Sequence, residues 1–381
     1  MTRHYSAERT MMPGGAPGQF VVIDGDFEFH AEACRYLGWL RAMDRSPNTE
    51  RVYAGRVARF LTYCESERLD WRNITARELT SYLKYIVTEP FSGTATEPLK
   101  TRFRTNRTAN AHLTTVCEFL RFAVSQGWVA GEIIHQLSHR RYLRYGPPGY
   151  DSGEDGQFRE IRARSILLRE SINRPETLDE GEVAKVVAVA GQHRDVLLVS
   201  LLFETGMRIG EALGLRREDM HLLSNSASVG CRINGPHLHV RRRMNQNGAC
   251  AKSRAPRSIP VTQSLVQIYV DYLDERSRVA GADTCDYVFV NIKRAPFGAP
   301  MKYHNAKKMF ERASKQAGLT IRPHMLRHTA ATRWLENGTP RDVVQALLGH
   351  VSLSSLEVYS HPSEARKREA VDRVDGGRYE Q

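Results

Sequence analysis

The sequence lacks any long apolar stretch. It contains no run of about 18 or more apolar residues, the length that a membrane-spanning helix needs, and its first residues hold no uninterrupted apolar signal segment. Neither membrane insertion nor export is supported, so we expect a cytoplasmic protein without a membrane partner. The 381 residues, 41% of them hydrophobic, suffice for two soluble domains with cores of their own.

Cysteine is scarce and scattered, and the chain has neither internal repeats nor low-complexity tracts. No two cysteines form a CxxC pair, and the spacing does not resemble the disulfide framework of a short secreted chain. We interpret all six as reduced core thiols: Cys34, Cys64, Cys117, Cys231, Cys250 and Cys285.

Acidic residues are the minority charge. The chain has 43 of them against 55 lysines and arginines, which gives a net charge of +12 and a pI near 9.5. This excess favours a polyanionic partner, with nucleic acid as the first candidate. A basic pI also simply raises solubility, so charge alone decides little.

The first part of the chain predicts a small helical domain. Residues 1–19 contain a glycine- and proline-rich run that we expect to fray, and helical spacing of apolar residues begins after them. Thr75 and Glu78 form a capping box before the third of four expected helices, and Gly127 ends the fourth. We therefore predict a helical domain over residues 20–140.

A basic segment separates the third and fourth helices, and a polar segment follows the fourth. The basic residues are Lys100, Arg102, Arg104 and Arg107, which are either free to meet DNA phosphates or part of a solvated loop. Residues 141–176 are rich in glycine, proline and polar residues and are predicted to be a linker. The capping box of Asp179 and Glu182 then starts a mixed helix and strand domain.

Arg208 lies at a tight junction between two predicted helices. The apolar run before it stops at Thr205-Gly206, and Glu211 follows one helical turn later. A guanidinium held in this way is positioned to bind a phosphate in bidentate fashion. The alternative is a surface pair of Arg208 with Glu211 that only aids solubility.

Lys252 lies near the tip of a predicted β-hairpin. Strand-like residues 238–241 precede the turn signal Asn247-Gly248, and a second strand is expected at residues 257–261. An ammonium on such a loop can donate a proton to a leaving alkoxide, although most hairpin lysines are only solvated.

His324, Arg327 and His328 follow a proline that suits the first position of a helix. Their spacing places them on one face of that helix. The two histidines also have the spacing of a metal pair, but no HExxH glutamate, cysteine or carboxylate cluster accompanies them. We therefore favour phosphate binding over a metal and expect no cofactor.

A further apolar helix is predicted to end at Gly349, followed directly by His350 and, nine residues later, by Tyr359. Tyr359 has polar neighbours that suit a partly exposed hydroxyl, although such a tyrosine is ordinarily structural. Two arginines, two histidines, a lysine and a tyrosine together suit metal-free attack on a phosphodiester. The arginines would neutralise the charge that builds on phosphorus, and a phenol serves as both nucleophile and leaving group.

The order of these motifs resembles that of the tyrosine recombinase or phage integrase family. Thr-Gly-Met-Arg-Ile-Gly-Glu-Ala-Leu, a hairpin lysine, His-x-x-Arg, Leu-Leu-Gly-His and a tyrosine follow one another between Thr177 and His361. The resemblance implies a mainly helical fold with a small antiparallel sheet, in which a SAM-like core-binding domain precedes a mixed α+β catalytic domain at residues 177–362.

The resemblance also implies a role for each residue. Tyr359 would form a 3′-phosphotyrosine, and Arg208 and Arg327 would bind the non-bridging oxygens. His324 and His350 would add hydrogen bonds and help to transfer protons. Lys252 would be the general acid, with Glu211 in a supporting position.

Double-stranded DNA would be the partner, and four protomers would assemble on two sites, from a chain that is monomeric when free. Residues 363–381 would be either a helix passed to a neighbouring protomer or a charged tail. Accessory proteins and the DNA target stay open, and a transposon recombinase or a simple integrase fits better than a large phage integrase. The rivals are a catalytically silent DNA-binding protein of the same fold, a type IB topoisomerase and a histidine metalloenzyme.

Overall fold

The computed structural model describes residues 3–11, 18–90, 102–142, 160–170, 176–227, 230–251 and 255–349. These residues group into two compact units, the first ending with the segment at residues 160–170 and the second beginning at residue 176. Each unit has its own hydrophobic core. We describe them one at a time.

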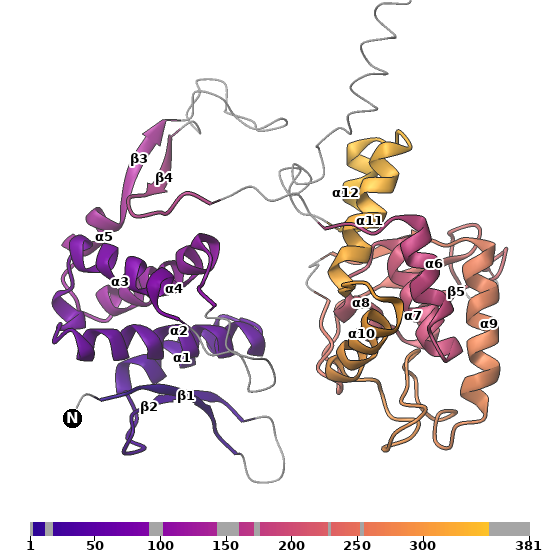
Figure 1. Ribbon diagram of the computed structural model, residues 1–381, viewed down its shortest axis with the longest axis horizontal. Helices are drawn as coiled ribbons and strands as arrows, with labels where there is room; N and C mark the ends of the chain where they lie inside the picture. Colours follow the sequence, from indigo (N-terminus) through magenta and orange to yellow (C-terminus); the bar gives the residue numbers. More distant parts are fainter. Residues whose placement is uncertain are drawn as a thin grey trace, which may run out of the picture. The chain divides into compact units, whose positions relative to one another are not determined.

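Helices make up most of the first unit (Figure 1). The capping box of Thr75 and Glu78 is present, because the Thr75 hydroxyl accepts from the Glu78 N–H and the Glu78 carboxylate accepts from the Thr75 N–H. The helices are α1 (Ala31–Ala42), α2 (Pro47–Ser66), α3 (Ala76–Thr88), α4 (Asn106–Ser125) and α5 (Glu132–Leu137), with a 3₁₀ turn at Trp71–Asn73.

Aromatic side chains fill the core between these helices. Tyr36, Phe60, Tyr82 and Phe119 are fully buried where α1, α2, α3 and α4 pack against one another. The rings of Phe60 and Tyr82 meet edge to face with their centroids 5.3 Å apart, a favourable geometry. The core therefore joins all four long helices into one body.

The prediction that residues 1–19 fray is wrong for their described part. Strand β1 (Ser6–Arg9) pairs antiparallel with β2 (Phe20–Ile23), and both lie against α2 below the helices in Figure 1. Tyr5 is 8% exposed, and its N–H donates to the Thr62 hydroxyl at 2.9 Å. The strand is held because it buries Tyr5 and Val22 in the helical core. Residues 12–17, the run that predicted fraying, lie outside the described residues.

The predicted linker at residues 141–176 also contains ordered structure. Strand β3 (Ser138–Tyr142) pairs antiparallel with β4 (Glu160–Arg164). After β4, Leu168 exchanges two hydrogen bonds with the Asn110 side chain, at 2.9 and 3.0 Å, and Ile166 packs against the first core. Residues 160–170 thus belong to the first unit, because their apolar side chains and amides find partners there.

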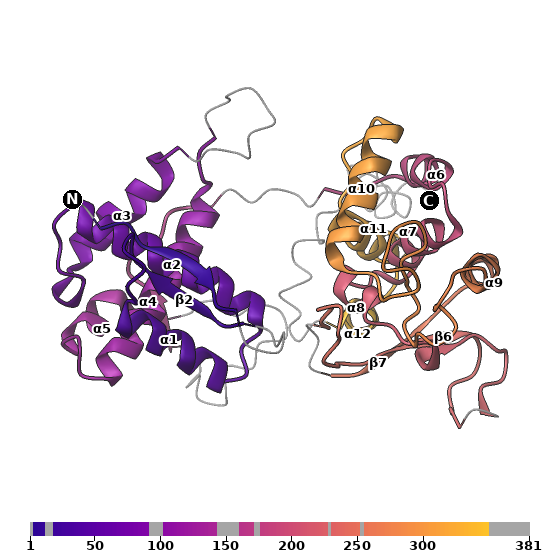
Figure 2. The same ribbon diagram turned by 90° about the horizontal axis from the view of Figure 1, so that it is seen from below.

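The second unit is built around a buried helix. Helices α6 (Glu180–Ala188), α9 (Gln263–Ser277) and α11 (Pro323–Glu336) pack around α7 (His193–Thr205), as Figure 2 shows. The remaining helices are α8 (Ile209–Leu213), α10 (Tyr303–Ala317) and α12 (Arg341–Leu348). The capping box of Asp179 and Glu182 starts α6, as predicted.

A small antiparallel sheet completes this unit. It has the order β5 (Met220–His221), β6 (His237–Val240) and β7 (Arg257–Pro260), with a 3₁₀ turn at Arg217–Asp219 before β5. The Gly248 N–H bonds the Asn245 carbonyl at 2.9 Å, which forms a turn at the predicted position between β6 and β7. The fold class is as predicted, mainly helical with small antiparallel sheets. Among the described residues, no helix is long and apolar enough to cross a bilayer.

Two glycines end the helices that meet in this unit. Gly206 ends α7 with φ of 59° and Gly349 ends α12 with φ of 64°, in the left-handed region that favours glycine. A Cβ on Gly206 would lie 2.9 Å from Leu348 Cδ2 and 3.3 Å from Ala330 Cβ. The end of α7 thus lies directly against α12 and α11, with no room for a larger residue.

We predict that Gly206→Ala lowers the free energy of unfolding by about 1–3 kcal/mol more than Gly318→Ala. Both glycines end helices in the left-handed region, but Gly318, after α10, has open space around it, so the control carries only the backbone strain. Urea denaturation of the two variants beside the wild type measures the difference. Equal losses would show that the contact with α11 and α12 is loose.

Candidate active site

Arg208 is held at the junction between α7 and α8 by Glu211. The Arg208 N–H donates to Glu211 Oε2 at 3.0 Å, and Arg208 Nη1 donates to Glu211 Oε1 at 3.1 Å. The Arg208 side chain is 26% exposed, whereas that of Glu211 is fully buried. The buried Glu211 carboxylate thus holds the Arg208 guanidinium, part of which faces solvent. Because Glu211 is buried, the two residues are not a surface ion pair that only aids solubility.

Arg257, the first residue of β7, is a second partner of Glu211. Its Nη2 donates to Glu211 Oε2 at 2.7 Å, and its side chain is 9% exposed. Burial alone would raise the pKa of Glu211, but the hydrogen bond and charge of Arg257, together with Arg208, hold the pKa below its usual value. Glu211 is therefore a carboxylate at neutral pH. The sequence predicted only that residue 257 begins a strand.

Arg327 lies on α11 but does not reach solvent as a phosphate ligand would. It is 1% exposed, and its Nη1 and Nη2 donate to the carbonyls of Gly206 at 2.6 Å and Leu348 at 2.9 Å. Arg327 therefore joins the end of α7 to the end of α12, because the last carbonyls of helices need donors.

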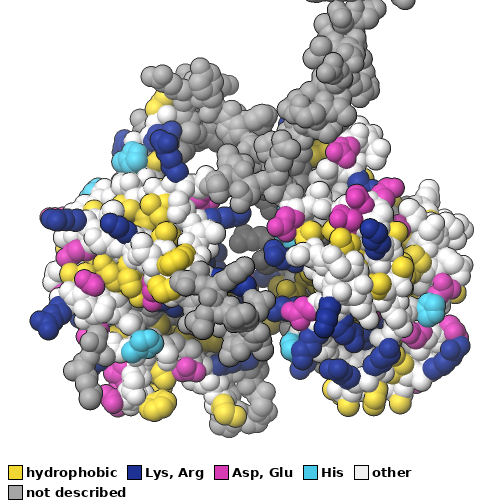
Figure 3. Space-filling model, viewed as in Figure 1, with side chains coloured by type: hydrophobic (Ala, Val, Ile, Leu, Met, Phe, Trp, Pro, Cys, Tyr) yellow, Lys and Arg dark blue, Asp and Glu magenta, His cyan; other side chains and the backbone are white. Residues whose placement is uncertain are grey.

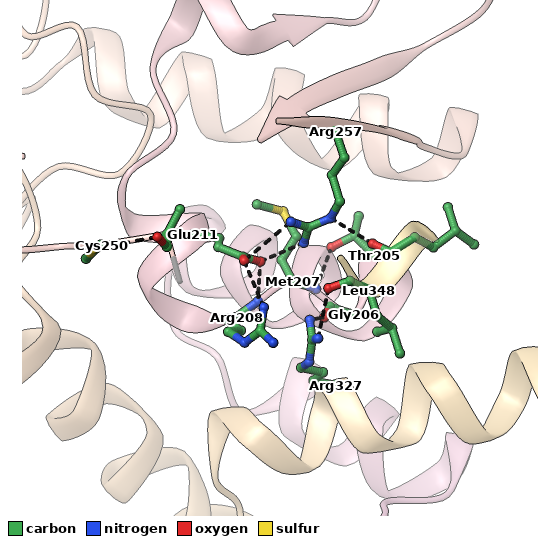
Figure 4. A network of polar contacts seen from close by, with 11 residues as sticks. Thr205, Gly206, Met207, Arg208, Glu211, Cys250, Arg257, Arg327 and Leu348 are labelled. Carbon is green, nitrogen blue, oxygen red and sulfur yellow. Dashed lines mark hydrogen bonds and ion pairs between the residues drawn. The ribbon is translucent and has the colours of Figure 1, made fainter. Parts of the chain in front are cut away.

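Arg257 also binds α12, since its Nε donates to the Leu347 carbonyl at 2.9 Å. Figure 4 shows how these side chains converge between α7, α8, β7, α11 and α12. Arg208, Arg257 and Arg327 carry three positive charges, and among the described residues the carboxylate that pairs with two of them is Glu211. The cluster thus has a surplus of two positive charges, partly buried, where a phosphate is stabilised more than in water.

The two histidines of α11 lie next to each other. The His324 and His328 rings meet edge to face with centroids 4.2 Å apart, and His324 is exposed. Burial lowers the pKa of His328 to about 4, with smaller contributions from His324 and Arg327, so His328 is neutral at physiological pH. Among the described residues, no cluster of three metal-binding side chains includes this pair.

Lys252, His350 and Tyr359 lie outside the described residues. The residues directly before Lys252 and His350 are described. Gly210 has no space for a Cβ, which would lie 2.7 Å from the Cys250 carbonyl, so residues 249–251 pass against α8. A Cβ on Gly349 would lie 2.8 Å from Arg257 Nη1. The described residues Cys250 and Gly349 therefore lie against α8 and against Arg257, respectively.

The basic segment of the first unit is only partly as expected. Arg104 is 11% exposed and binds Glu89 Oε2 at 3.0 Å, so its charge is not free to meet phosphates. Glu89 also pairs with Arg59, so one carboxylate holds two arginines. Arg102 and Arg107 are exposed, and Lys100 lies outside the described residues.

The second unit also has a basic surface that was not predicted from the sequence. A surface hollow beside α10 is lined mainly by cations: Lys293, Arg294, Lys308, Arg312 and Lys315, with Glu311 among them. Figure 3 shows Lys and Arg side chains gathered on the lower part of this unit. Residues 293–315 contain several lysines and arginines but a single acidic residue, Glu311, and this pattern in the sequence could have predicted the surface.

Family models match most of the chain. The model described as "Phage integrase family" matches residues 176–366, which is half of the chain and includes every residue of the candidate site. The model described as "Phage integrase, N-terminal SAM-like domain" matches residues 35–127, within the helical first unit.

Similar proteins include transposon enzymes. The chain is 27% identical over 348 residues to transposase A from transposon Tn554 of Staphylococcus aureus, and the match covers 91% of each chain. It is 30% identical over 200 residues to tyrosine recombinase XerA of Pyrococcus horikoshii, covering 52% of this chain and 61% of XerA. The solved Tn1549 transposon integrase, in complex with transposon right end DNA, shares the fold at a TM-score of 0.59, with 16% identity and coverage of 90% and 99%.

We predict that Glu211→Gln lowers the free energy of unfolding by about 3 kcal/mol at neutral pH, because it leaves Arg208 and Arg257 without their buried counter-charge. Glu218→Gln is the matched control. That carboxylate pairs with Arg243 at 2.7 Å but is 66% exposed, so we expect a loss below about 1 kcal/mol.

The effect of Glu211→Gln also depends on pH. The pKa of Glu211 is lowered on folding, so its contribution is fully present above the pKa of the unfolded chain, about 4, and is lost as the pH falls through the lower pKa of the folded state. Urea denaturation from pH 7 to pH 3 should show the wild type converging on the variant. A constant gap over this range would mean that the lost charge is not the cause.

Proposed function

The chain belongs to the phage integrase family and is a tyrosine-type site-specific DNA recombinase, and we propose that Tyr359 is its nucleophile. The tyrosine oxygen attacks the scissile phosphorus and forms a P–O bond as the bond to the 5′ oxygen breaks. The products are a 3′-phosphotyrosine and a free 5′-hydroxyl. Attack of a 5′-hydroxyl from another strand reverses the step, so no nucleotide or metal is needed to conserve the bond energy.

The observation that carries this proposal is the buried carboxylate of Glu211 between Arg208 and Arg257. A phosphodiester gains a second negative charge in the pentavalent transition state, and the cluster has a surplus of two positive charges to meet it. Arg208 is the partly exposed member, so it makes the direct contact with a non-bridging oxygen. Glu211 keeps the Arg208 guanidinium in place in the absence of DNA. The arginine side chain therefore needs little rearrangement when the reaction takes place.

Arg327 acts on the same phosphate from a buried position. Its bonds to Gly206 and Leu348 hold the turn before Arg208 and the end of α12 together, and its charge adds to the field at the site. His324 and His350 donate hydrogen bonds to the phosphate and help to remove the tyrosine proton. His324 is exposed on the first turn of α11, which suits contact with a bound substrate.

The domain organisation that we propose assigns DNA to both units. Arg102 and Arg107 contact the phosphate backbone from the first unit, together with Lys100, and the cations around α10 do so from the second. Four protomers assemble on two sites, with residues 363–381 passed to a neighbour and accessory proteins optional. The similarity to a transposon transposase over 91% of both chains supports service to a mobile element in the cytoplasm.

We predict that Tyr359→Phe abolishes a covalent protein–DNA complex that the wild type forms on nicked DNA carrying the element's ends. The phenyl ring keeps the shape of the side chain but offers no oxygen to phosphorus. Denaturing gels run after incubation with a chelator measure the complex. Wild-type complex in chelator would exclude the metalloenzyme, and its absence on sites that the protein demonstrably binds would favour the silent DNA-binding alternative.

Recombination must also be separated from topoisomerase activity. A type IB topoisomerase relaxes any supercoiled plasmid as a monomer, whereas the proposed enzyme exchanges strands between two specific sites. A plasmid carrying two element ends and an identical plasmid without them distinguish the two. Relaxation of both plasmids at the same rate, with no exchange product, would overturn the recombinase assignment.

We predict that Lys252→Ala slows cleavage of ordinary DNA at least about 100-fold but leaves DNA with a 5′-bridging sulfur at the scissile bond nearly unaffected. The alkoxide leaving group needs a proton, whereas a thiolate, whose conjugate acid has a pKa of about 8.5, departs without one. Single-turnover cleavage measures both rates. Tyr359→Phe is the control, since sulfur cannot rescue a missing nucleophile, and failure of sulfur to rescue Lys252→Ala would show that another group is the acid.

A further inference from the structure

The pairing of β5 with β6 brings three histidines together on one face of the small sheet. His221 is directly opposite His237 in the antiparallel register, and His239 follows His237 by two residues, so its side chain points to the same face. Leu238 and Val240 point to the other face and are buried in the core of the unit. The three imidazole rings have centroids 4.5–5.1 Å apart.

A cysteine reaches this face from the segment between the two strands. The segment doubles back on itself, because Asn225 forms a bridge with Asn234 and the Gly235 N–H donates to the Ser224 carbonyl at 3.1 Å. Cys231 lies within the returning part. Its Sγ is 3.3 Å from Nε2 of His237 and 3.6 Å from Nε2 of His239.

The outer nitrogens of two rings are held by backbone carbonyls. His237 Nδ1 lies 2.8 Å from the Gly235 carbonyl, and His221 Nε2 lies 3.2 Å from the Glu218 carbonyl. Each of these nitrogens must carry the proton to make its bond, which leaves the other nitrogen of the ring with a lone pair. For His221 that other nitrogen, Nδ1, is buried and has no hydrogen-bond partner among the residues that the structure describes. Second partners of this kind are typical of histidines that bind metals.

We propose that His221, Cys231, His237 and His239 form a structural zinc site. One ligand atom from each residue lies within 4.8 Å of all the others. In a zinc tetrahedron an S–N edge is about 3.6 Å and an N–N edge about 3.3 Å, so both Cys231 distances already fit. The other separations reach up to 4.8 Å, so the rings would have to shift as the ion binds. A thiolate with three imidazoles is a ligand set that suits zinc in preference to magnesium or calcium.

A zinc ion at this site would complete the bonding of its ligands. The bound ion would replace the proton of the Cys231 thiol and satisfy the buried nitrogen of His221. Four protein ligands leave no open position, which makes the site structural rather than catalytic. It fastens the segment between β5 and β6 onto the sheet.

Metal analysis of the full-length protein tests this proposal without any recombination assay. We expect the wild type to keep one zinc ion per chain through gel filtration. With cobalt in place of zinc we expect the visible bands of tetrahedral cobalt and a thiolate-to-cobalt charge-transfer band. Cys231→Ser should lose the zinc and the charge-transfer band, and His237→Ala should lose the zinc. Cys285→Ser removes a similarly half-buried thiol outside the proposed site, and it should keep the zinc, the visible cobalt bands and the charge-transfer band.

Alkylation of the wild type gives a second test that needs no variant. Zinc protects a thiolate ligand, so a chelator should speed modification of Cys231 about tenfold or more and leave Cys285 unchanged, as read by mass spectrometry. The proposal is overturned if the wild type retains no zinc, if Cys231→Ser retains as much as Cys285→Ser, or if chelator leaves the rate at Cys231 unaltered. None of these results bears on Tyr359, so the zinc site and the recombinase mechanism can fail independently.

Discussion

The second unit depends on one buried carboxylate. Glu211 has no exposed surface, and it makes ion pairs with Arg208 at the start of α8 and Arg257 at the start of β7. Without these two cations, its burial would be prohibitively costly, and without Glu211 the arginines would repel one another. The same contacts that hold the helix junction against the sheet therefore also set the direction of the Arg208 guanidinium, which we propose to contact DNA.

A second layer of contacts extends this arrangement to α12. Arg257 and Arg327 donate to the last carbonyls of that helix, at Leu347 and Leu348, and Arg327 also binds the Gly206 carbonyl. Gly206 and Gly349 permit these close approaches because a side chain on either would collide with a neighbour. The described part of the site is thus built from a few polar contacts and two glycine helix ends, all within a single compact unit.

Local signals in the sequence predicted the local structure well. The capping boxes at Thr75 and Asp179, the helix stops at Gly206 and Gly349, and the contact between Arg208 and Glu211 all involve residues within a few positions of one another. The order of short motifs was enough to identify the family. The role of Arg257 and the burial of Arg327 could not be predicted, because their partners lie 46 and 121 residues away.

The same limit explains the other differences. Strand β1 is ordered by core residues that are distant in the sequence. Arg104 is held inward by Glu89, which lies 15 residues earlier in the chain. The alternation in His237-Leu238-His239 indicates that two histidines share one face of a strand. The third member of the cluster, His221, joins them only through the pairing of β5 with β6. Roles for Lys252, His350 and Tyr359 stay predictions from motif order.

The partners of Arg257 and Arg327 on α12 are neutral carbonyls, and this has a consequence for the protein before it meets DNA. A carbonyl dipole orients a guanidinium without cancelling its charge, so the surplus of the cluster persists in the free protein. Such a centre attracts small dianions of suitable size. We therefore expect inorganic phosphate and sulfate to compete with DNA for it, so that the chemical identity of the surrounding anions, beyond their ionic strength, would affect how readily the enzyme binds its substrate.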